Sequence, residues 1–432
     1  MSFSWQKVNN FLETLKKFPL FKILYKIPFA PWFYHFLLAW MGAVIYSFPS
    51  RKIKVIGVTG TKGKSTTVEL ISFLLEKAGY KTSFFSSVHI KIGDKKERNY
   101  FGNSSPGRFF LQYFLKKSLE AGCHYAIVEV TSQGVVFSRH RFIKWSGGVF
   151  LNIHPEHIEA HGSFEKYLKA KTDFFRYAAK NPNCSFFINK DDPHFLDFQK
   201  AAGKREVVLF SGKEINLKES ELPSGLWGDF NKVNIAAAWA VAQKEGASEE
   251  ILKFLKDFEG LEGRMDFVQR EPFAVIVDYA HTPDSLEAIY QTVSRFKEKE
   301  GKMICVLGSC GGGRDKWKRP KMGEIAASFC DYVILTNEDP YDEDPMIILD
   351  EIEAGFKKNN LSKQMIFENN YWKIIDRKEA LRKAIDLANK GDVVIATGKG
   401  SELWIHLANG QKIPWSERKV FEEILKTKKE PA

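Results

Sequence analysis

Short apolar runs alternate with helical patterns over most of this chain. The first clear pair is an apolar run at residues 53–58 and, after a glycine-rich turn, a helical pattern at 68–76 whose apolar positions share one face. Further runs of strand length lie at residues 125–130, 147–152, 185–189, 274–278, 303–307, 332–336 and 393–396. Because strands that alternate with helices favour a parallel sheet covered on both faces, the sequence predicts an α/β fold.

The pattern divides the chain into three parts. Residues 1–50 form an apolar and basic segment, which we expect to be helical. A central α/β unit with a mostly parallel sheet occupies residues 51–262, and a second, Rossmann-like α/β unit occupies residues 263–432. The boundary falls in the stretch Gly260–Arg264, where two glycines stand beside a charged pair, as is typical of a hinge.

The segment before residue 50 carries two hydrophobic patterns. Residues 3–21 mix aromatic side chains with lysines at helical spacing, which fits a helix lying on a membrane or on a partner. Residues 29–48 are apolar and approach the length that spans a bilayer. Since His35 interrupts this run and Pro31 and Pro49 bracket it, we favour a helix packed on the protein or in the membrane interface over a true span.

Composition narrows the class of protein. The chain has 432 residues, of which 44% are hydrophobic and 27% charged, as in a soluble protein of two or three domains. Its net charge of +11 suits an anionic substrate or membrane surface, but the lysines are dispersed and no nucleic-acid-binding module is present. The five cysteines are odd in number and lack metal-site spacing, so we expect free thiols in a reducing, cytoplasmic compartment.

The turn after the first apolar run has the composition of a phosphate-binding loop. Its sequence is Gly60-Thr61-Lys62-Gly63-Lys64-Ser65-Thr66-Thr67. Glycines let backbone N–H groups face one anion, and the N-terminus of the following helix adds partial positive charge. We expect Lys64 to reach the terminal phosphates of ATP and Ser65 or Thr66 to bind Mg²⁺. Val58 stands where the common form of the motif has glycine, and Gly57 lies one residue early.

A series of further motifs follows in order along the chain. They are Asn103–Pro106, Glu129–Gln133, Asn152–Gly162, Tyr167–Lys171, Asn231–Asn234, Gly263–Asp266, Asp278–Pro283, Gly311–Pro320, Asp339–Pro340 and Gly398–Glu402. With these motifs, residues 53–420 resemble the Mur ligase family of ATP-dependent, amide-forming enzymes of peptidoglycan assembly, and most closely its MurE type. The resemblance implies that a muramoyl-peptide carboxylate attacks the γ-phosphate of ATP, and that the amine of a free amino acid then attacks the acyl phosphate.

The resemblance also implies roles for individual residues. Catalytic roles fall on Lys64, His157, Lys171 and Arg314. Nucleotide contacts fall on Gly60, Thr61, Lys62, Gly63, Lys64, Ser65, Thr66, Asn231, Asn234, Arg264, Asp278 and His281. Two Mg²⁺ sites are expected at Ser65, Glu129, His157 and Lys171, the last as a carbamate. Substrate contacts fall on Ser104, Ser105, Ser132, Arg139, Glu338, Asp339, Tyr341, Lys399 and Glu402.

Two departures from the family pattern bear on the substrates. About fifty residues precede the phosphate loop, where the family usually has a domain-sized uridine-binding block of roughly a hundred. We therefore expect the UDP group to be held differently, or the acceptor to be lipid-linked. The segment Glu338-Asp339-Pro340-Tyr341 stands where diaminopimelate-adding members have Asp-Asn-Pro-Arg. Its acidic residues and missing arginine favour an amino acid with an amine-bearing side chain, lysine or ornithine.

Other functions stay open at this point. One is a related ligase with another acceptor, similar to folylpolyglutamate synthase, and another is a nucleotide-binding scaffold without catalysis. The scaffold is less favoured, because pure nucleotide binding needs none of four residues: Lys64, Glu129, His157 and Lys171. The expected partners are the muramoyl peptide and the amino acid, with a peripheral membrane contact through residues 1–50 and no nucleic acid. We expect a monomer.

Overall fold

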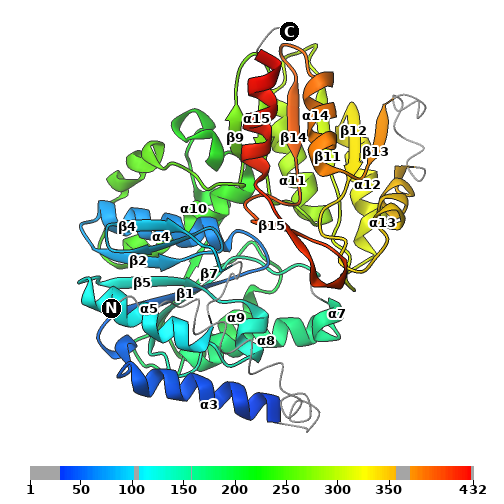
Figure 1. Ribbon diagram of the computed structural model, residues 1–432. Coiled ribbons are helices and arrows are strands. Elements are labelled where there is room, and N and C mark those ends of the chain that lie inside the picture. Colours follow the sequence, from blue (N-terminus) through cyan, green and yellow to red (C-terminus); the bar gives the residue numbers. More distant parts are fainter. Residues whose placement is uncertain (1–29, 102–106, 157, 357–369, 430–432) are drawn as a thin grey trace.

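The chain folds around two β-sheets that lie side by side (Figure 1). The computed structural model describes residues 30–101, 107–156, 158–356 and 370–429. The first sheet has eight strands in the order β4-β3-β2-β5-β1-β6-β7-β8. The second has six strands in the order β13-β12-β11-β14-β10-β9, and β15 and β16 form a separate two-stranded ribbon.

The strands and helices have the following bounds. The first sheet contains β1 (Lys54–Thr59), β2 (Thr82–Phe85), β3 (His89–Ile92), β4 (Lys95–Arg98), β5 (Tyr125–Glu129), β6 (Trp145–Phe150), β7 (Ser185–Asn189) and β8 (Val207–Phe210). The second contains β9 (Asp266–Gln269), β10 (Ala274–Val277), β11 (Met303–Leu307), β12 (Tyr332–Thr336), β13 (Tyr371–Ile374) and β14 (Val393–Ala396), and the ribbon is β15 (Trp404–His406) with β16 (Lys412–Pro414). The helices are α3 (Ala30–Ile45), α4 (Lys64–Lys77), α5 (Arg108–Glu120), α6 (Ser132–Val136), α7 (Ile158–His161), α8 (Phe164–Ala178), α9 (Phe195–Ala202), α10 (Asp229–Lys244), α11 (Pro283–Val293), α12 (Lys318–Phe329), α13 (Pro345–Glu353), α14 (Arg377–Leu387) and α15 (Glu417–Lys429).

Strand β1 lies at the centre of the first sheet, between and parallel to β5 and β6. One face of the sheet packs against α4 and α10, and the other packs against α5, α8 and α9. Covering both faces explains the continuous apolar runs, because side chains that alternate across the sheet are buried on either side. The carboxyl ends of β1, β5 and β6 therefore meet at one edge.

The second sheet is also covered on both faces. Helices α11, α12 and α13 pack on one side, and α14 and α15 on the other. Five strands run parallel and β9 pairs antiparallel with β10 at the edge. The predicted α/β fold with two such units is confirmed. The antiparallel strands β3 and β4 escape prediction, because β4 is a charged edge strand (Lys-Lys-Glu-Arg) without an apolar position.

The apolar run predicted at residues 29–48 contains helix α3. The helix packs on α5, with Ala39 and Ala43 buried between them. Among the helices that the structure describes, none combines the length and hydrophobicity needed to cross a membrane. The prediction for residues 3–21 lies outside the described residues.

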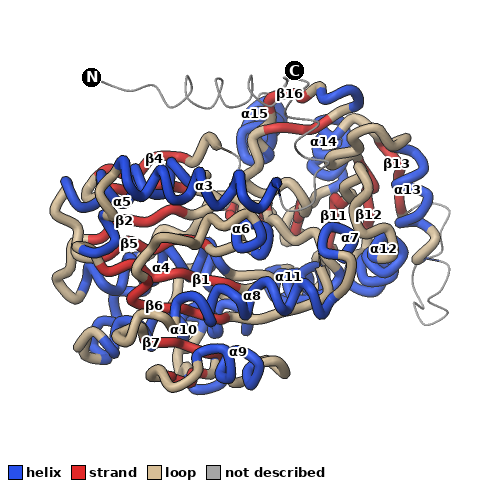
Figure 2. The backbone as a smooth tube through the Cα atoms, turned by 90° about the horizontal axis from the view of Figure 1, so that it is seen from below, coloured by secondary structure: helices blue, strands red, loops and turns tan. Residues whose placement is uncertain are grey.

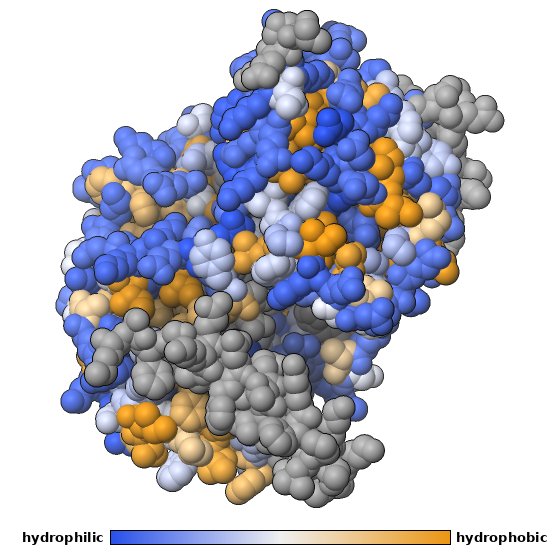
Figure 3. All heavy atoms as spheres, viewed as in Figure 1, coloured by the Kyte–Doolittle hydropathy of each residue, from blue (hydrophilic) through white to orange (hydrophobic). Residues whose placement is uncertain are grey.

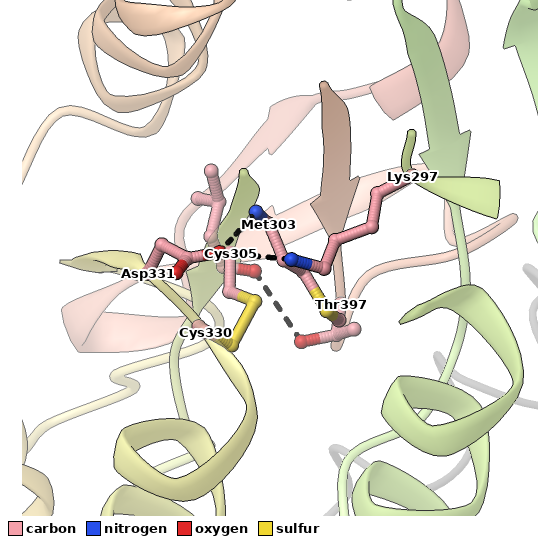
Figure 4. Close-up of a disulfide and its surroundings, with 7 residues drawn as sticks. Lys297, Met303, Cys305, Cys330, Asp331 and Thr397 are labelled. Atoms are coloured by element: carbon pink, nitrogen blue, oxygen red, sulfur yellow. Dashed lines mark hydrogen bonds and ion pairs between the residues drawn. A yellow bond between two sulfur atoms is a disulfide. The ribbon is translucent and has the colours of Figure 1, made fainter. Parts of the chain in front are cut away.

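The expectation that all five cysteines are free thiols is wrong. Cys305, in β11, forms a disulfide with Cys330, which directly follows α12 (Figure 4). The two residues lie 25 positions apart in sequence, and the crossover through α12 returns the second beside the first. Cys123, Cys184 and Cys310 are free and buried. Sequence spacing could not indicate this pair, because the packing of α12 on the sheet creates it.

Candidate active site

The phosphate loop connects the end of β1 to the start of α4. Lys64 folds back over the loop and donates hydrogen bonds to the carbonyl oxygens of Gly60 and Thr61, both at 2.9 Å. Gly63 has a φ of +82°, and a Cβ there would lie 2.2 Å from Asn234 Oδ1. Gly63 is thus required both by its backbone conformation and by the approach of α10.

The early glycine in this motif has a packing role. Gly57 lies inside β1, where an added Cβ would come within 2.5 Å of the Phe174 ring and 2.9 Å of Trp145. Gly57 lets α8 approach the sheet closely. Because Gly57 lies within the strand, its position one residue before the usual motif glycine does not alter the loop.

Asn152 clamps the loop from the neighbouring strand. It follows β6, and its Oδ1 accepts hydrogen bonds from the backbone N–H groups of Thr61 at 3.1 Å and Lys62 at 2.9 Å. The Thr61 hydroxyl also contacts Tyr167 Oη at 3.0 Å. Neither Asn152 nor Tyr167 was predicted as a site residue. The available signal was the position of Asn152 at the carboxyl end of an apolar run.

Glu129 ends β5 directly beside the loop. Its buried carboxylate accepts hydrogen bonds from the Ser65 hydroxyl at 2.8 Å and from the Ser87 N–H at 2.6 Å. Burial raises the pKa of Glu129, while the Lys64 charge and the two serines oppose this shift. The structure therefore brings two of the predicted magnesium ligands together. Carboxylate and hydroxyl oxygens beside a phosphate loop suit Mg²⁺.

Lys171 reaches the same loop from α8. Its Nζ donates to the Gly60 carbonyl at 2.7 Å, and the side chain is only 2% exposed. Burial lowers the pKa of the Lys171 amine well below its ordinary value, and the charges of Lys64 and Lys62 add to this effect. Charge-bearing residues from three elements thus meet around one loop: Lys64 from α4, Glu129 from β5 and Lys171 from α8.

Three predicted site residues lie outside the part of the chain that the structure describes. They are His157, Ser104 and Ser105. Within the described ranges, no cluster of three or more histidine, cysteine or acidic residues is arranged to bind a metal ion.

The C-terminal unit closes over the loop through a buried polar cluster. His281 Nε2 lies 2.9 Å from Glu156 Oε1 and 3.3 Å from Lys62 Nζ, and Lys62 lies 3.1 Å from Glu156. Burial lowers the pKa of His281, as does the nearby Lys62, while Glu156 opposes them. Lys62 and His281 were both predicted at the nucleotide. Glu156 lies within the Asn152–Gly162 motif, but the sequence predicts no role for it.

The stretch that the sequence predicts as a hinge packs closely on the C-terminal unit. Gly263 has a φ of +68°, and a Cβ there would lie 2.2 Å from the Ser401 nitrogen. Arg264 lies over the Tyr279 ring at 4.1 Å. Both oxygens of Asp278 accept backbone hydrogen bonds, from Met265 at 2.8 Å and Ala280 at 2.7 Å. Asp278 thus fixes the backbone that directly follows Arg264.

The two predicted asparagines of α10 connect the loop to the segment before that helix. Asn234 Oδ1 accepts from the Thr67 hydroxyl at 3.1 Å, and its Nδ2 donates to Asn231 Oδ1 at 2.9 Å. Asn231 donates in turn to the Trp227 carbonyl at 3.0 Å. Both side chains are buried, so the structure places them behind the loop as a brace.

The predicted acceptor residues on α6 and after it lie near α7 and α8. The buried Ser132 hydroxyl lies 3.1 Å from His161 Nε2. Burial lowers the pKa of the Arg139 guanidinium, which lies 5.9 Å from the Phe137 ring. His161 in turn packs on the Tyr167 ring at 5.3 Å, and Tyr167 contacts Thr61 of the phosphate loop.

The segment predicted to select the amino acid is charge-balanced within the chain. Lys399 donates to Asp339 at 2.8 Å and to Glu402 at 2.6 Å. Although burial opposes it, Glu402 and Asp339 raise the pKa of Lys399, which keeps its positive charge. Burial works to raise the pKa of Glu338, but Lys318 and His281 hold it below its ordinary value.

Arg314 lies at this same segment. Its guanidinium donates to Tyr341 Oη at 3.3 Å, and Tyr341 stacks on His406 at a centroid distance of 5.2 Å. Part of the negative charge that favours a lysine or ornithine substrate is balanced here within the chain. Lys399 already pairs two of the carboxylates, and Arg314 supplies a cation beside the tyrosine that replaces the family's arginine.

Comparison with known proteins identifies the family. The model described as Mur ligase middle domain matches residues 58–218, and that described as Mur ligase, glutamate ligase domain matches residues 263–400. The UDP-N-acetylmuramoyl-L-alanyl-D-glutamate–2,6-diaminopimelate ligase of Cytophaga hutchinsonii is 35% identical over 409 residues, covering 90% of this chain and 81% of that protein. The chain belongs to the Mur ligase family. The sequence-based family assignment is thereby confirmed, as is the ligase class.

Other Mur ligases and related structures agree with this assignment. The UDP-N-acetylmuramyl-tripeptide synthetase of a Roseiflexus species is 36% identical over 414 residues, covering 88% of this chain and 80% of that protein. A solved diaminopimelate ligase of the same kind as the Cytophaga protein aligns with a TM-score of 0.57 and 25% identity, over 88% of this chain and 79% of that one. Mycobacterium tuberculosis folylpolyglutamate synthase, solved with ADP and AMPPCP, shares the fold. It aligns with a TM-score of 0.66 and 16% identity, over 84% of this chain and 92% of that one.

Proposed function

We propose that this Mur ligase joins an amino acid to the carboxylate of a muramoyl peptide and uses ATP to form an acyl phosphate. The observation that carries the proposal is the convergence of Lys64, Glu129 and Lys171 on one phosphate loop. This convergence occurs in a chain 35% identical to a ligase named for the same reaction class. A nucleotide-binding scaffold would have no use for a buried lysine and a buried carboxylate at the loop.

The reaction transfers one phosphoryl group and then releases it. A carboxylate oxygen of the acceptor attacks the γ-phosphorus of ATP, and the bond to the ADP oxygen breaks. The amine of the amino acid next attacks the acyl carbonyl, loses a proton and expels phosphate. Lys64 would stabilise the negative charge that spreads over the phosphoryl oxygens in the first step.

Two magnesium ions would complete the phosphate site. Ser65, Glu129 and His157 are the proposed ligands of one, and a carbamate on Lys171 is the proposed ligand of the other. When bound, magnesium neutralises the oxygens of ATP that face the incoming carboxylate. The lowered pKa of Lys171 supports the carbamate, because only a neutral amine adds CO₂.

The remaining residues are proposed to hold the three substrates. Gly60 to Thr66 would bind the phosphates of ATP, and Arg264 and His281 would approach them from the C-terminal unit. Asn231, Asn234 and Asp278 would shape the nucleotide site through the backbone they brace. Ser104, Ser105, Ser132 and Arg139 would hold the acceptor.

For the amino acid we propose diaminopimelate, in place of the lysine or ornithine favoured by sequence. Arg314 beside Tyr341 offers a cation to a distal carboxylate. Lys399 pairs with Glu402 and Asp339. Together, these three side chains would contact the amino and carboxyl groups at one end of the amino acid. The similarity to ligases named for 2,6-diaminopimelate supports the choice.

The wider setting belongs to the same proposal. We propose units at residues 1–50, 51–262 and 263–432, a monomeric enzyme, and a reaction in the cytoplasm, where ATP is available. A peripheral membrane contact is proposed for residues 1–50.

Mass spectrometry of the product tests the function. The enzyme is incubated with ATP, Mg²⁺, UDP-muramoyl dipeptide and an equimolar mixture of diaminopimelate, lysine and ornithine. We expect a product heavier than the acceptor by diaminopimelate less one water, and phosphate release that requires both acceptor and amino acid. Lysine as the added residue would overturn the specificity alone, while ATP hydrolysis without any ligated product would overturn the function.

A further inference from the structure

Helix α3 presents an uncharged, apolar face to solvent. None of its 16 residues is an aspartate, glutamate, lysine or arginine. The outward side chains are Phe33, Leu37, Trp40, Met41, Val44 and Ile45, each between 38% and 59% exposed. These residues are called the α3 ridge here, and a helix of this length carries them over roughly 24 Å. An exposed apolar stripe of this size marks a contact surface. Figure 3 shows apolar side chains along the lower edge of the molecule, where Figure 1 places α3.

A basic hollow lies next to the ridge. A cavity of about 780 Å³ is lined by α6, the end of α7, α8 and the turn after α6. Its charged lining consists of Arg141, Lys166, Lys169, Arg176 and Lys180 against one carboxylate, Asp173. Lys169 and Arg176 both pair with Asp173. The hollow therefore keeps an excess of positive charge.

The ridge and the hollow are continuous. The ring of His35 on α3 packs against Phe137 at 4.8 Å, and Phe36 packs against Phe142 at 5.0 Å. Arg141 lies 5.6 Å from the Phe36 ring, and both Arg141 and Phe137 line the hollow. Figure 2, which views the molecule from below, shows α3, α6 and α8 together on that face. Apolar and cationic groups thus occupy adjoining parts of one surface.

We propose that the α3 ridge and the basic hollow form a docking surface for the anionic face of a lipid bilayer. Helix α3 lies in the interfacial plane with its ridge among the acyl chains, and the cations of the hollow meet lipid phosphates. This pairing of an apolar helix face with flanking cations is how peripheral proteins bind anionic membranes. The surface goes beyond the ligase reaction, because it needs neither ATP nor an acceptor.

Charge complementarity favours lipid over the other occupants of this surface. In sequence, residues 1–29 contain five lysines and one glutamate, so covering the hollow with them would bring like charges together. A second copy in a twofold dimer would likewise set one basic hollow beside another. Anionic lipid satisfies the cations and the apolar ridge at once.

Vesicle flotation of the full chain tests the proposal. We compare phosphatidylcholine vesicles with vesicles that also contain phosphatidylglycerol, at low and high salt. We expect binding to the anionic vesicles and its loss at high salt. Leu37→Glu/Val44→Glu should reduce the bound fraction about tenfold by placing charges in the ridge. Lys166→Glu/Lys180→Glu should reduce it by a similar factor.

Matched controls keep the test independent of folding and of catalysis. Leu196→Glu/Ile347→Glu changes two exposed apolar side chains on α9 and α13 and should bind vesicles as the parent does. Thermal unfolding is recorded for every variant. Equal binding to neutral vesicles, or unaltered binding by the α3 variant, would overturn the proposal. So would a dimer by light scattering that the α3 variant dissociates. None of these results would bear on the ligase assignment.

Discussion

At the scale of single residues, Lys64 is the cation that we propose stabilises the transferred phosphoryl group. It is held by two loop carbonyls, so its direction is fixed before nucleotide binds. Lys64→Ala removes this charge, and we expect kcat to fall roughly 100-fold or more. Amino-acid-dependent phosphate release measures the effect. Lys77→Ala, at the exposed far end of the same helix, is the control and should leave the rate unchanged.

A second residue-scale prediction concerns His140, which is buried beside the basic hollow. Burial and Arg141 lower the pKa of His140 from 6.5 to about 3. Below pH 6.5 the unfolded chain binds a proton that the folded chain rejects, so stability falls as the pH decreases. This residue alone should cost about 2 kcal/mol in the free energy of unfolding between pH 7 and pH 5.

His140→Phe keeps an aromatic ring against Tyr177 and removes the titration. Urea unfolding at the two pH values should show a loss of stability smaller by that amount than in the parent. An unchanged pH dependence would mean that His140 is solvated and titrates normally in the folded protein.

At the scale of elements, the phosphate loop depends on how closely α10 approaches it. Gly63→Ala adds a Cβ against Asn234. Because the loop must then shift, we expect the affinity for ATP to fall roughly tenfold or more. Gly79→Ala is a matched control, since Gly79 also has a positive φ but has no atom within 4 Å of an added Cβ. Both variants should lose about 1–2 kcal/mol of stability from backbone strain. Calorimetric titration with ATP should show weaker binding for Gly63→Ala and unchanged binding for Gly79→Ala. If both variants lost the same affinity, the contact with Asn234 could not be the cause.

The strands also show which elements the sequence can predict. The apolar runs predict β5, β7, β11, β12 and β14 because these strands are buried on both faces. Charged β4 and half-buried β3 give no such signal. The sequence reveals the phosphate loop through its glycines and lysine. The clamp by Asn152 depends on β6 lying next to β1, and the Cys305–Cys330 disulfide depends on the packing of α12 against the sheet.

Charge arguments from sequence have a similar limit. Glu338, Asp339 and Glu402 suggest a cationic substrate when read alone, but Lys399 follows the end of another strand and pairs with Asp339 and Glu402. Counting charges within one motif could not include a partner 60 residues away. Spatial pairing therefore has to be known before a substrate charge is inferred.

At the scale of the whole molecule, the two α/β units meet at the phosphate loop. His281 joins Lys62 and Glu156 across this junction, and all three side chains are largely buried. His281→Ala removes a contact worth about 1 kcal/mol, so we expect KM for ATP to rise several-fold. Small-angle X-ray scattering should show a larger radius of gyration as the units separate.

The matched control for this junction is His154→Ala. His154 faces Asp284 at 3.7 Å, but that pair is solvent-exposed and should contribute little. A change of KM of the same size in both variants would contradict a specific role for the buried cluster.

The most direct test of the ligase mechanism follows the oxygen atoms of the acceptor carboxylate. The acceptor is labelled with ¹⁸O in that carboxylate and incubated with ATP, Mg²⁺ and diaminopimelate, and the released phosphate is analysed by mass spectrometry. An acyl-phosphate route predicts one ¹⁸O atom in each phosphate, because the attacking oxygen leaves with phosphorus. Phosphate without label, formed together with ligated product, would contradict transfer of the phosphoryl group to the carboxylate.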